Sequence, residues 1–156
     1  MAPSRFQMKA ASMAVGRKWL LTITEGGMLT YWIVAVMVAF EIIHIPPAYM
    51  YSDYQDPLIM IWNWSFFPID MLFALTGLAS RFSSISARNS EILSVISLSL
   101  MLCAGVMAIS FWTMQKTFDP LWWGVNLWLI ILSVFVLIEK FTRTEDAENN
   151  ELKGPP

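Results

Sequence analysis

The chain has 156 residues and a net charge of −2, and 56% of its residues are hydrophobic while only 14% are charged. Soluble domains carry about 25% charged residues, so this composition indicates an integral membrane protein, and the small net charge argues against nucleic-acid binding. A single cysteine excludes an intrachain disulfide, and with a single histidine it excludes a metal site built from these two residue types. We expect no metal and no cofactor.

Residues 1–27 form a basic segment that lacks the long apolar core and small-residue cleavage site of a signal peptide. Within it, the run Trp19–Thr24 is typical of a short interfacial helix. The pair Gly26-Gly27 is expected to break the chain before the first span.

Four apolar stretches follow, and each is long enough to cross a hydrocarbon core at about 1.5 Å per residue. No polar face remains that would suit helices of a soluble domain. The sequence therefore predicts an all-α fold, a four-helix transmembrane bundle over residues 28–138, and a multi-pass membrane location, the cell membrane in a bacterium. The expected spans are residues 28–45, 58–79, 92–112 and 121–138.

The basic residues predict the orientation of these spans. Nine of the ten Lys and Arg residues lie in the N-terminal segment, in the loop after the second span or in the C-terminal tail, and Lys116 is the exception. Both termini are therefore expected in the cytoplasm. The tail, residues 139–156, is acidic and polar and is expected to be a disordered end.

The second span carries an intramembrane carboxyl group, Asp70. A carboxylate at such a depth costs about 2.5–3.5 kcal/mol on insertion scales, and intramembrane carboxyls are functional by default. Pro68 cannot donate to the carbonyl of Trp64, so a kink is expected there. Asp70 would then form the floor of a cleft that narrows from the outer surface, although a purely structural, hydrogen-bonded acid is the alternative.

An Asp-Pro pair opens both the second and the fourth span, at residues 56–57 and 119–120, with Asp as the helix cap and Pro at the first helical position. Polar residues follow at the same intervals of seven and fourteen. Duplication of a two-helix hairpin would explain this match, and so would chance combined with similar capping. The matching residues are Asn63 and Asp70 in the second span and Asn126 and Ser133 in the fourth.

A polar layer in the outer leaflet is the candidate site above Asp70. Glu41 is expected about 6 Å inside the first span, with His44 on the same helix face. Each residue also has a purely structural alternative. The two asparagines would form helix–helix hydrogen bonds, the tryptophans would form an interfacial belt, and Glu41 would be exposed to water. The candidate catalytic residues are Asp70 and Glu41, and the candidate ligand-binding residues are Asn63, Asn126, His44, Trp62, Trp64 and Trp123.

Three segments resemble the YvaD-like family of small bacterial four-span membrane proteins. They are Trp62–Leu78, Met107–Trp112 and Phe118–Leu129, and the resemblance runs over about residues 30–138. It implies four helices and supplies no activity or site residues. The part before Gly26 and the acidic tail look additional to the family pattern.

Three functions remain open. The first is binding of a lipophilic small molecule or lipid, with a catalytic version in which Glu41 and Asp70 act as acid and base on an isoprenoid-like substrate. The second is a small proton-coupled transporter. The third is an accessory subunit of a membrane-protein complex or a homo-oligomer, favoured by a seam of small residues between Ser94 and Ala108.

Overall fold

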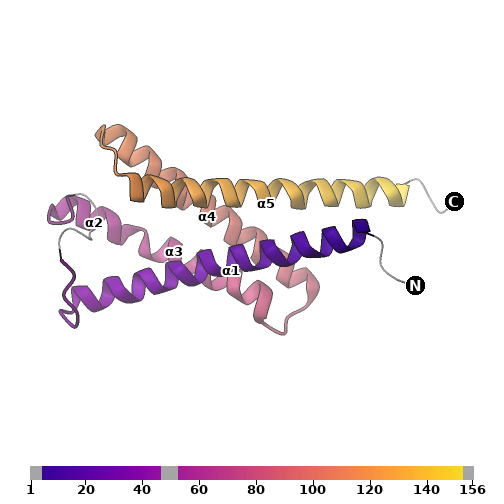
Figure 1. The fold of residues 1–156 in the computed structure, drawn as a ribbon, viewed down its shortest axis with the longest axis horizontal. Helices are drawn as coiled ribbons and strands as arrows, with labels where there is room; N and C mark the ends of the chain where they lie inside the picture. Colours follow the sequence, from indigo (N-terminus) through magenta and orange to yellow (C-terminus); the bar gives the residue numbers. More distant parts are fainter. Residues whose placement is uncertain (1–4, 47–52, 153–156) are drawn as a thin grey trace. The chain divides into compact units, whose positions relative to one another are not determined.

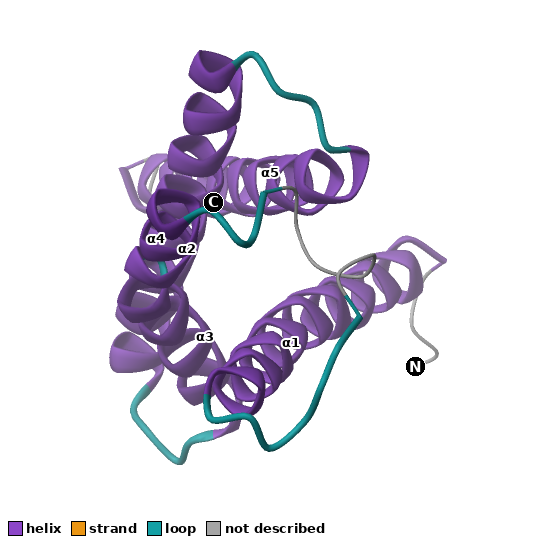
Figure 2. Ribbon diagram, turned by 90° about the vertical axis from the view of Figure 1, so that its left-hand side faces the viewer, coloured by secondary structure: helices purple, strands orange, loops and turns teal. Residues whose placement is uncertain are grey.

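The structure is a computed structural model that describes residues 5–46 and 53–152. Every regular element in these two ranges is an α-helix, which confirms the predicted all-α fold, and Figure 2 shows helices joined by loops with no strand in those ranges. In chain order (Figure 1) the helices are α1 (Arg5–Ala39), α2 (Pro57–Ser65), α3 (Phe67–Phe82), α4 (Ala87–Gln115) and α5 (Pro120–Leu152).

Four stretches of helix are long and apolar enough to cross a membrane, as the sequence predicted. They are Val15–Ala39, Pro57–Phe82, Ala87–Gln115 and Pro120–Arg143, with 25, 26, 29 and 24 residues. The second stretch comprises both α2 and α3.

The first span differs from the prediction, because α1 passes through Gly26-Gly27 without a break and ends at Ala39. Glycine weakens a helix by about 1 kcal/mol, but a helix in hydrocarbon must keep its backbone hydrogen bonds. No side chain crowds either glycine. The apolar stretch therefore begins at Val15, and Glu41 (φ 57°) lies in a turn beyond the helix end.

The predicted kink in the second span is confirmed as a break at Phe66, which separates α2 from α3. Pro68 lies in the first turn of α3, where its missing N–H costs nothing. The amide of Phe66 donates to the carbonyl of Asn63 at 3.1 Å, and the amide of Asp70 donates to the carbonyl of Phe66 at 2.9 Å. Asp70 is thereby placed in the first turn of a new helix.

The predicted Asp caps are also confirmed. A carboxylate oxygen of Asp56 accepts from the amides of Leu58 and Ile59 at 2.7 and 3.3 Å. A carboxylate oxygen of Asp119 accepts from the amides of Leu121 and Trp122 at 3.0 and 3.2 Å.

The helix α5 continues to Leu152, into the segment where the sequence predicted a disordered tail. An ion pair between Arg143 and Glu139 (2.5 Å), one helical turn apart, stabilises the first turn of this segment. Residues 153–156 of the predicted tail lie outside the described ranges.

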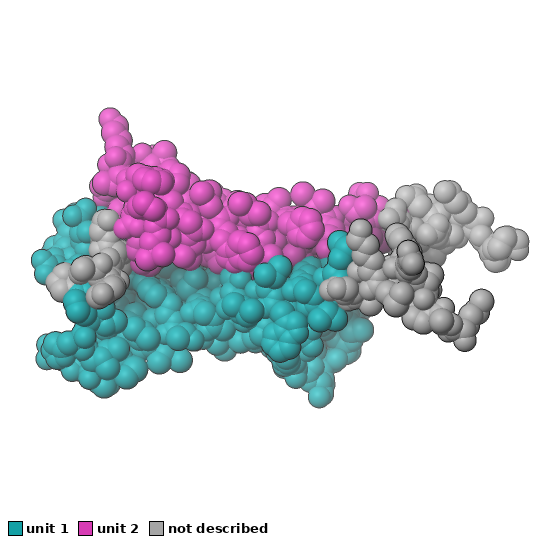
Figure 3. Space-filling model, viewed as in Figure 1, with its two compact units in different colours: residues 1–97 teal, residues 98–156 magenta. Residues whose placement is uncertain are grey.

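The chain divides into two compact units, residues 1–97 and residues 98–156 (Figure 3). In the first unit, α1 and α3 run antiparallel. Glu25 contacts Arg81, and Trp32, later in α1, contacts Asp70, which is earlier in α3. We call this contact the α1–α3 seam. The start of α4 joins it through Ser97.

In the second unit, the rest of α4 meets α5 at Gly105. A Cβ added there would lie 2.8 Å from the side chain of Ile130 and 2.9 Å from the carbonyl oxygen of Asn126. Ala104 and Ala108 are also buried. Small residues therefore permit this close approach, as predicted for the third span.

Candidate functional site

Asp70 is the buried carboxyl group of the α1–α3 seam. It is 6% exposed, and its Oδ2 accepts a hydrogen bond from the indole Nε1 of Trp32 on α1 at 3.0 Å. Trp32 is itself only 1% exposed. Among the described residues, no hydrogen bond reaches the second carboxyl oxygen, Oδ1, so Asp70 retains acceptor capacity.

Three aromatic rings pack around Trp32, the hydrogen-bond donor to this carboxyl group. The ring of Trp32 lies 5.1 Å from Tyr31, 5.3 Å from Trp64 and 5.1 Å from Phe67, measured between centroids. Trp64 lies in the last turn of α2 and Phe67 begins α3, and both rings pack against Trp32, the residue that donates to Asp70. We call Tyr31, Trp32, Trp64 and Phe67 the aromatic cluster.

Asn63 lies beside the same cluster and is buried. The hydroxyl of Tyr31 donates a hydrogen bond to Oδ1 of Asn63 at 3.1 Å, and Nδ2 of Asn63 donates one to the same hydroxyl at 3.0 Å. This is the helix–helix hydrogen bond that the sequence left open as an alternative to ligand binding. The contacts of α1 with α2 and α3 thus bring together three residues predicted for the site: Asn63, Trp64 and Asp70.

Glu41 and His44 lie elsewhere. Both are exposed and follow the end of α1, so the prediction that they share a helix face is wrong. No hydrogen bond or ion pair connects Glu41 with Asp70 within the described ranges. A role for Glu41 or His44 in ligand binding stays a prediction.

The other predicted residues make local contacts. Trp62 lies 4.9 Å from Phe66 between ring centroids. In the second unit, the side-chain amide of Asn126 donates to the carbonyl of Trp122 at 2.8 Å. The indole of Trp123 donates to the carbonyl of Thr117 at 3.4 Å. Their place in a ligand site also stays a prediction.

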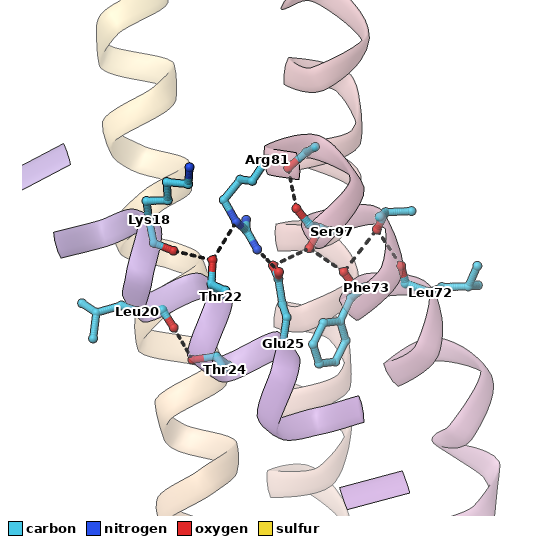
Figure 4. A network of polar contacts seen from close by, with 12 residues as sticks. Lys18, Leu20, Thr22, Thr24, Glu25, Leu72, Phe73, Arg81 and Ser97 are labelled. Carbon is cyan, nitrogen blue, oxygen red and sulfur yellow. Dashed lines mark hydrogen bonds and ion pairs between the residues drawn. The ribbon is translucent and has the colours of Figure 1, made fainter. Parts of the chain in front are cut away.

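Sequence reasoning missed a second buried group on the seam, the ion pair between Glu25 of α1 and Arg81 of α3 (Figure 4). The side chain of Glu25 is 0% exposed and that of Arg81 is 13% exposed. The hydroxyl of Ser97 on α4 lies 3.3 Å from Oε1 of Glu25 as a donor. Nε of Arg81 donates to the hydroxyl of Thr22 at 3.3 Å.

A signal for this pair exists in the residue spacing. Glu25 precedes Trp32 by seven residues on α1, and Asp70 precedes Gly77 by seven residues on α3. Seven residues are close to two helical turns, so each pair shares a helix face. Gly77 provides the space that the carboxylate of Glu25 occupies, since a Cβ there would overlap it.

Gly77→Ala is therefore expected to destabilise the protein by about 1–3 kcal/mol, the usual cost of overpacking. The added Cβ would also lie 2.5 Å from Oγ of Ser97. Thermal unfolding in detergent measures the effect. Gly26→Ala is the matched control, because no neighbour lies within 4 Å of its added Cβ. Equal unfolding midpoints for the two variants would contradict the close packing at Gly77.

The helices and the seam together define a class: an all-helical protein with four helices suited to cross a membrane and with buried charged groups between two of them. Residues 17–147 match the protein-family model "Family of unknown function (DUF5360)", and the chain belongs to this family. The match includes Glu25, so the region before Gly26 is partly within the family pattern and not additional to it.

A relative supports the predicted resemblance. The chain is 34% identical over 134 residues to "Uncharacterized protein YvaD" of Bacillus subtilis (strain 168), covering 83% of this chain and 97% of that protein. The resemblance to the YvaD-like family is thus confirmed. No solved structure matches the chain.

Proposed function

We propose that this membrane protein binds a lipophilic small molecule or a lipid beside Asp70. The observation that carries the proposal is a buried carboxyl group with one oxygen held by Trp32 and the other without a hydrogen-bond donor in the described part of the chain. A carboxyl group at this depth is costly, which favours a role that requires it. The ligand would carry a hydroxyl or amine that donates to Oδ1.

The aromatic cluster supports an apolar body for this ligand. Trp64 and Phe67, which pack against Trp32, are half-buried, so part of each ring remains open. Aromatic faces bind hydrocarbon and also attract an ammonium group. With both termini in the cytoplasm, as the basic residues predict, α2 would begin at the outer surface. Protease protection of a terminal tag in inverted vesicles measures that orientation.

The acid–base enzyme is less well supported than ligand binding. It requires a second group beside Asp70, and Glu41 lies beyond the end of α1. The hydrogen-bond partner of Asp70 is the indole of Trp32, which donates a hydrogen bond but does not act as an acid or base near neutral pH.

Mass spectrometry of protein extracted in polymer-bounded lipid discs, without detergent, tests the proposal. We expect a small molecule or lipid enriched over the bulk membrane lipid in the wild-type protein. Asp70→Asn should reduce its retention about tenfold or more, because a hydrogen bond to a charged group contributes about 1.5–3 kcal/mol. Asn keeps the shape of the side chain and an oxygen that can accept from Trp32.

Glu91→Gln is the matched control, since it neutralises an exposed carboxylate on α4. Retention that is equal in Asp70→Asn and the wild type, or no enriched small molecule at all, would contradict the proposal. Recovery of a stoichiometric protein partner in its place would favour the accessory-subunit hypothesis.

A further inference from the structure

Glu25 is a buried acid that the proposed ligand site does not use. The two carboxyl groups lie on one seam, separated by about two helical turns, or roughly 10 Å. Within the first unit, Arg81 is the charged group that faces Glu25 from α3, and α4 presents the uncharged Ser97. On α1 the neighbouring charged residue is Lys18, whose ammonium lies 4.9 Å from the ring centroid of Phe82.

The hydrogen-bonding neighbours of Glu25 suit a neutral as well as an ionised carboxyl group. The single hydroxyl proton of Ser97 has two acceptors, Oε1 of Glu25 at 3.3 Å and the carbonyl of Phe73 at 2.8 Å. When this proton points to Phe73, the hydroxyl oxygen can accept a hydrogen bond from the O–H group of a protonated Glu25. Ser97 therefore stabilises Glu25 with or without a bound proton.

Arg81 has a route away from Glu25. It lies in the last turn of α3, which ends at Phe82, and its side chain is partly exposed. Long basic side chains near the ends of membrane helices extend to the headgroup region. Thr22 lies about one turn from Glu25 toward the start of α1. Its hydroxyl accepts a hydrogen bond from Nε of Arg81 and donates one to the carbonyl of Lys18 at 2.8 Å.

We infer that Glu25 is a proton-binding site whose counter-ion, Arg81, is displaced when the proton binds. A proton from the aqueous phase at the Arg81 end forms an O–H bond on the Glu25 carboxylate, and the ion pair separates. The guanidinium keeps its charge and moves to the headgroups, so one positive charge is taken up. Ion pairs buried in low dielectric depend on both partners being charged, which couples the two events.

This inference does not depend on ligand binding at Asp70. It couples the binding of a proton at Glu25 to the movement of Arg81. Infrared difference spectroscopy of the reconstituted protein on acidification measures it directly. The carbonyl stretching band of protonated, buried carboxyl groups should appear in the wild type, and its Glu25 component should be lost in Glu25→Gln. It should persist in Asp70→Asn and in Glu91→Gln, whose carboxylate is exposed.

A band that is unchanged in Glu25→Gln would overturn the inference, and so would the absence of any buried-carboxyl band in the wild type. If Glu25→Gln does not fold, Ser97→Ala decides the question because it leaves the acid in place. Loss of the Ser97 hydroxyl should shift the frequency of the band. An unshifted band would overturn the inference, because it would belong to a different carboxyl group.

Discussion

Replacing Arg81 with alanine is expected to destabilise the folded protein by about 3–5 kcal/mol, the cost of leaving a buried charge without its partner. Glu25 is 0% exposed, and Arg81 is the cation that pairs with it. The same change also removes the hydrogen bond to Thr22. Thermal or denaturant unfolding in detergent, with retained helicity as the check of folding, measures this loss.

Arg88→Ala is the matched control, because Arg88 is exposed in the first turn of α4. Exposed substitutions typically change stability by less than about 0.5 kcal/mol. The double variant Arg81→Ala/Glu25→Gln should recover much of the loss, since no charge is then left unpaired. If Arg81→Ala were as stable as Arg88→Ala, the ion pair would contribute nothing to the seam.

The features predicted correctly from sequence are those that depend on length and local chemistry. Four long apolar runs predict four membrane helices because hydrocarbon leaves the backbone few alternatives. The caps at Asp56 and Asp119 and the break before Pro68 depend on residues adjacent in sequence. The sequence predicts Asn63 and Asp70 as polar residues of the second span, and both are buried against α1.

The errors arise from the position of one helix. The sequence predicts a break at Gly26-Gly27, which puts Glu25 outside the first span and leaves its partner Arg81 in a basic loop, whereas α1 runs through both glycines. The same shift placed Glu41 inside the membrane. Glycine is tolerated in membrane helices more often than in soluble ones, which made this inference unsafe.

The partners of the polar residues depend on the register of α1 against α3, which a single sequence does not reveal. Trp32 and Tyr31 look like ordinary apolar positions of the first span. Only the antiparallel contact shows that their polar atoms meet Asp70 and Asn63. Matched spacings of seven residues on both helices were available in the sequence, but they become meaningful only when the two helices are aligned.

Replacing Trp32 with alanine is expected to destabilise the protein by about 3–5 kcal/mol, as for other buried aromatic residues. The change leaves a cavity among Tyr31, Trp64 and Phe67 and removes the donor to Asp70. Trp32→Phe keeps one aromatic ring and should cost less, about 1–3 kcal/mol, from the loss of the indole N–H and of part of the ring. Unfolding in detergent distinguishes the two variants.

Trp19→Ala is the matched control on the same helix, because Trp19 is 57% exposed and its loss should have a small effect. The cost of Trp32→Phe should fall in an Asp70→Asn background, since a neutral acceptor makes a weaker hydrogen bond than a carboxylate. A cost that is the same in both backgrounds would mean that the ring, and not its bond to Asp70, stabilises the seam. The hydrogen bond from the indole to Asp70 would then contribute nothing to the stability of the protein.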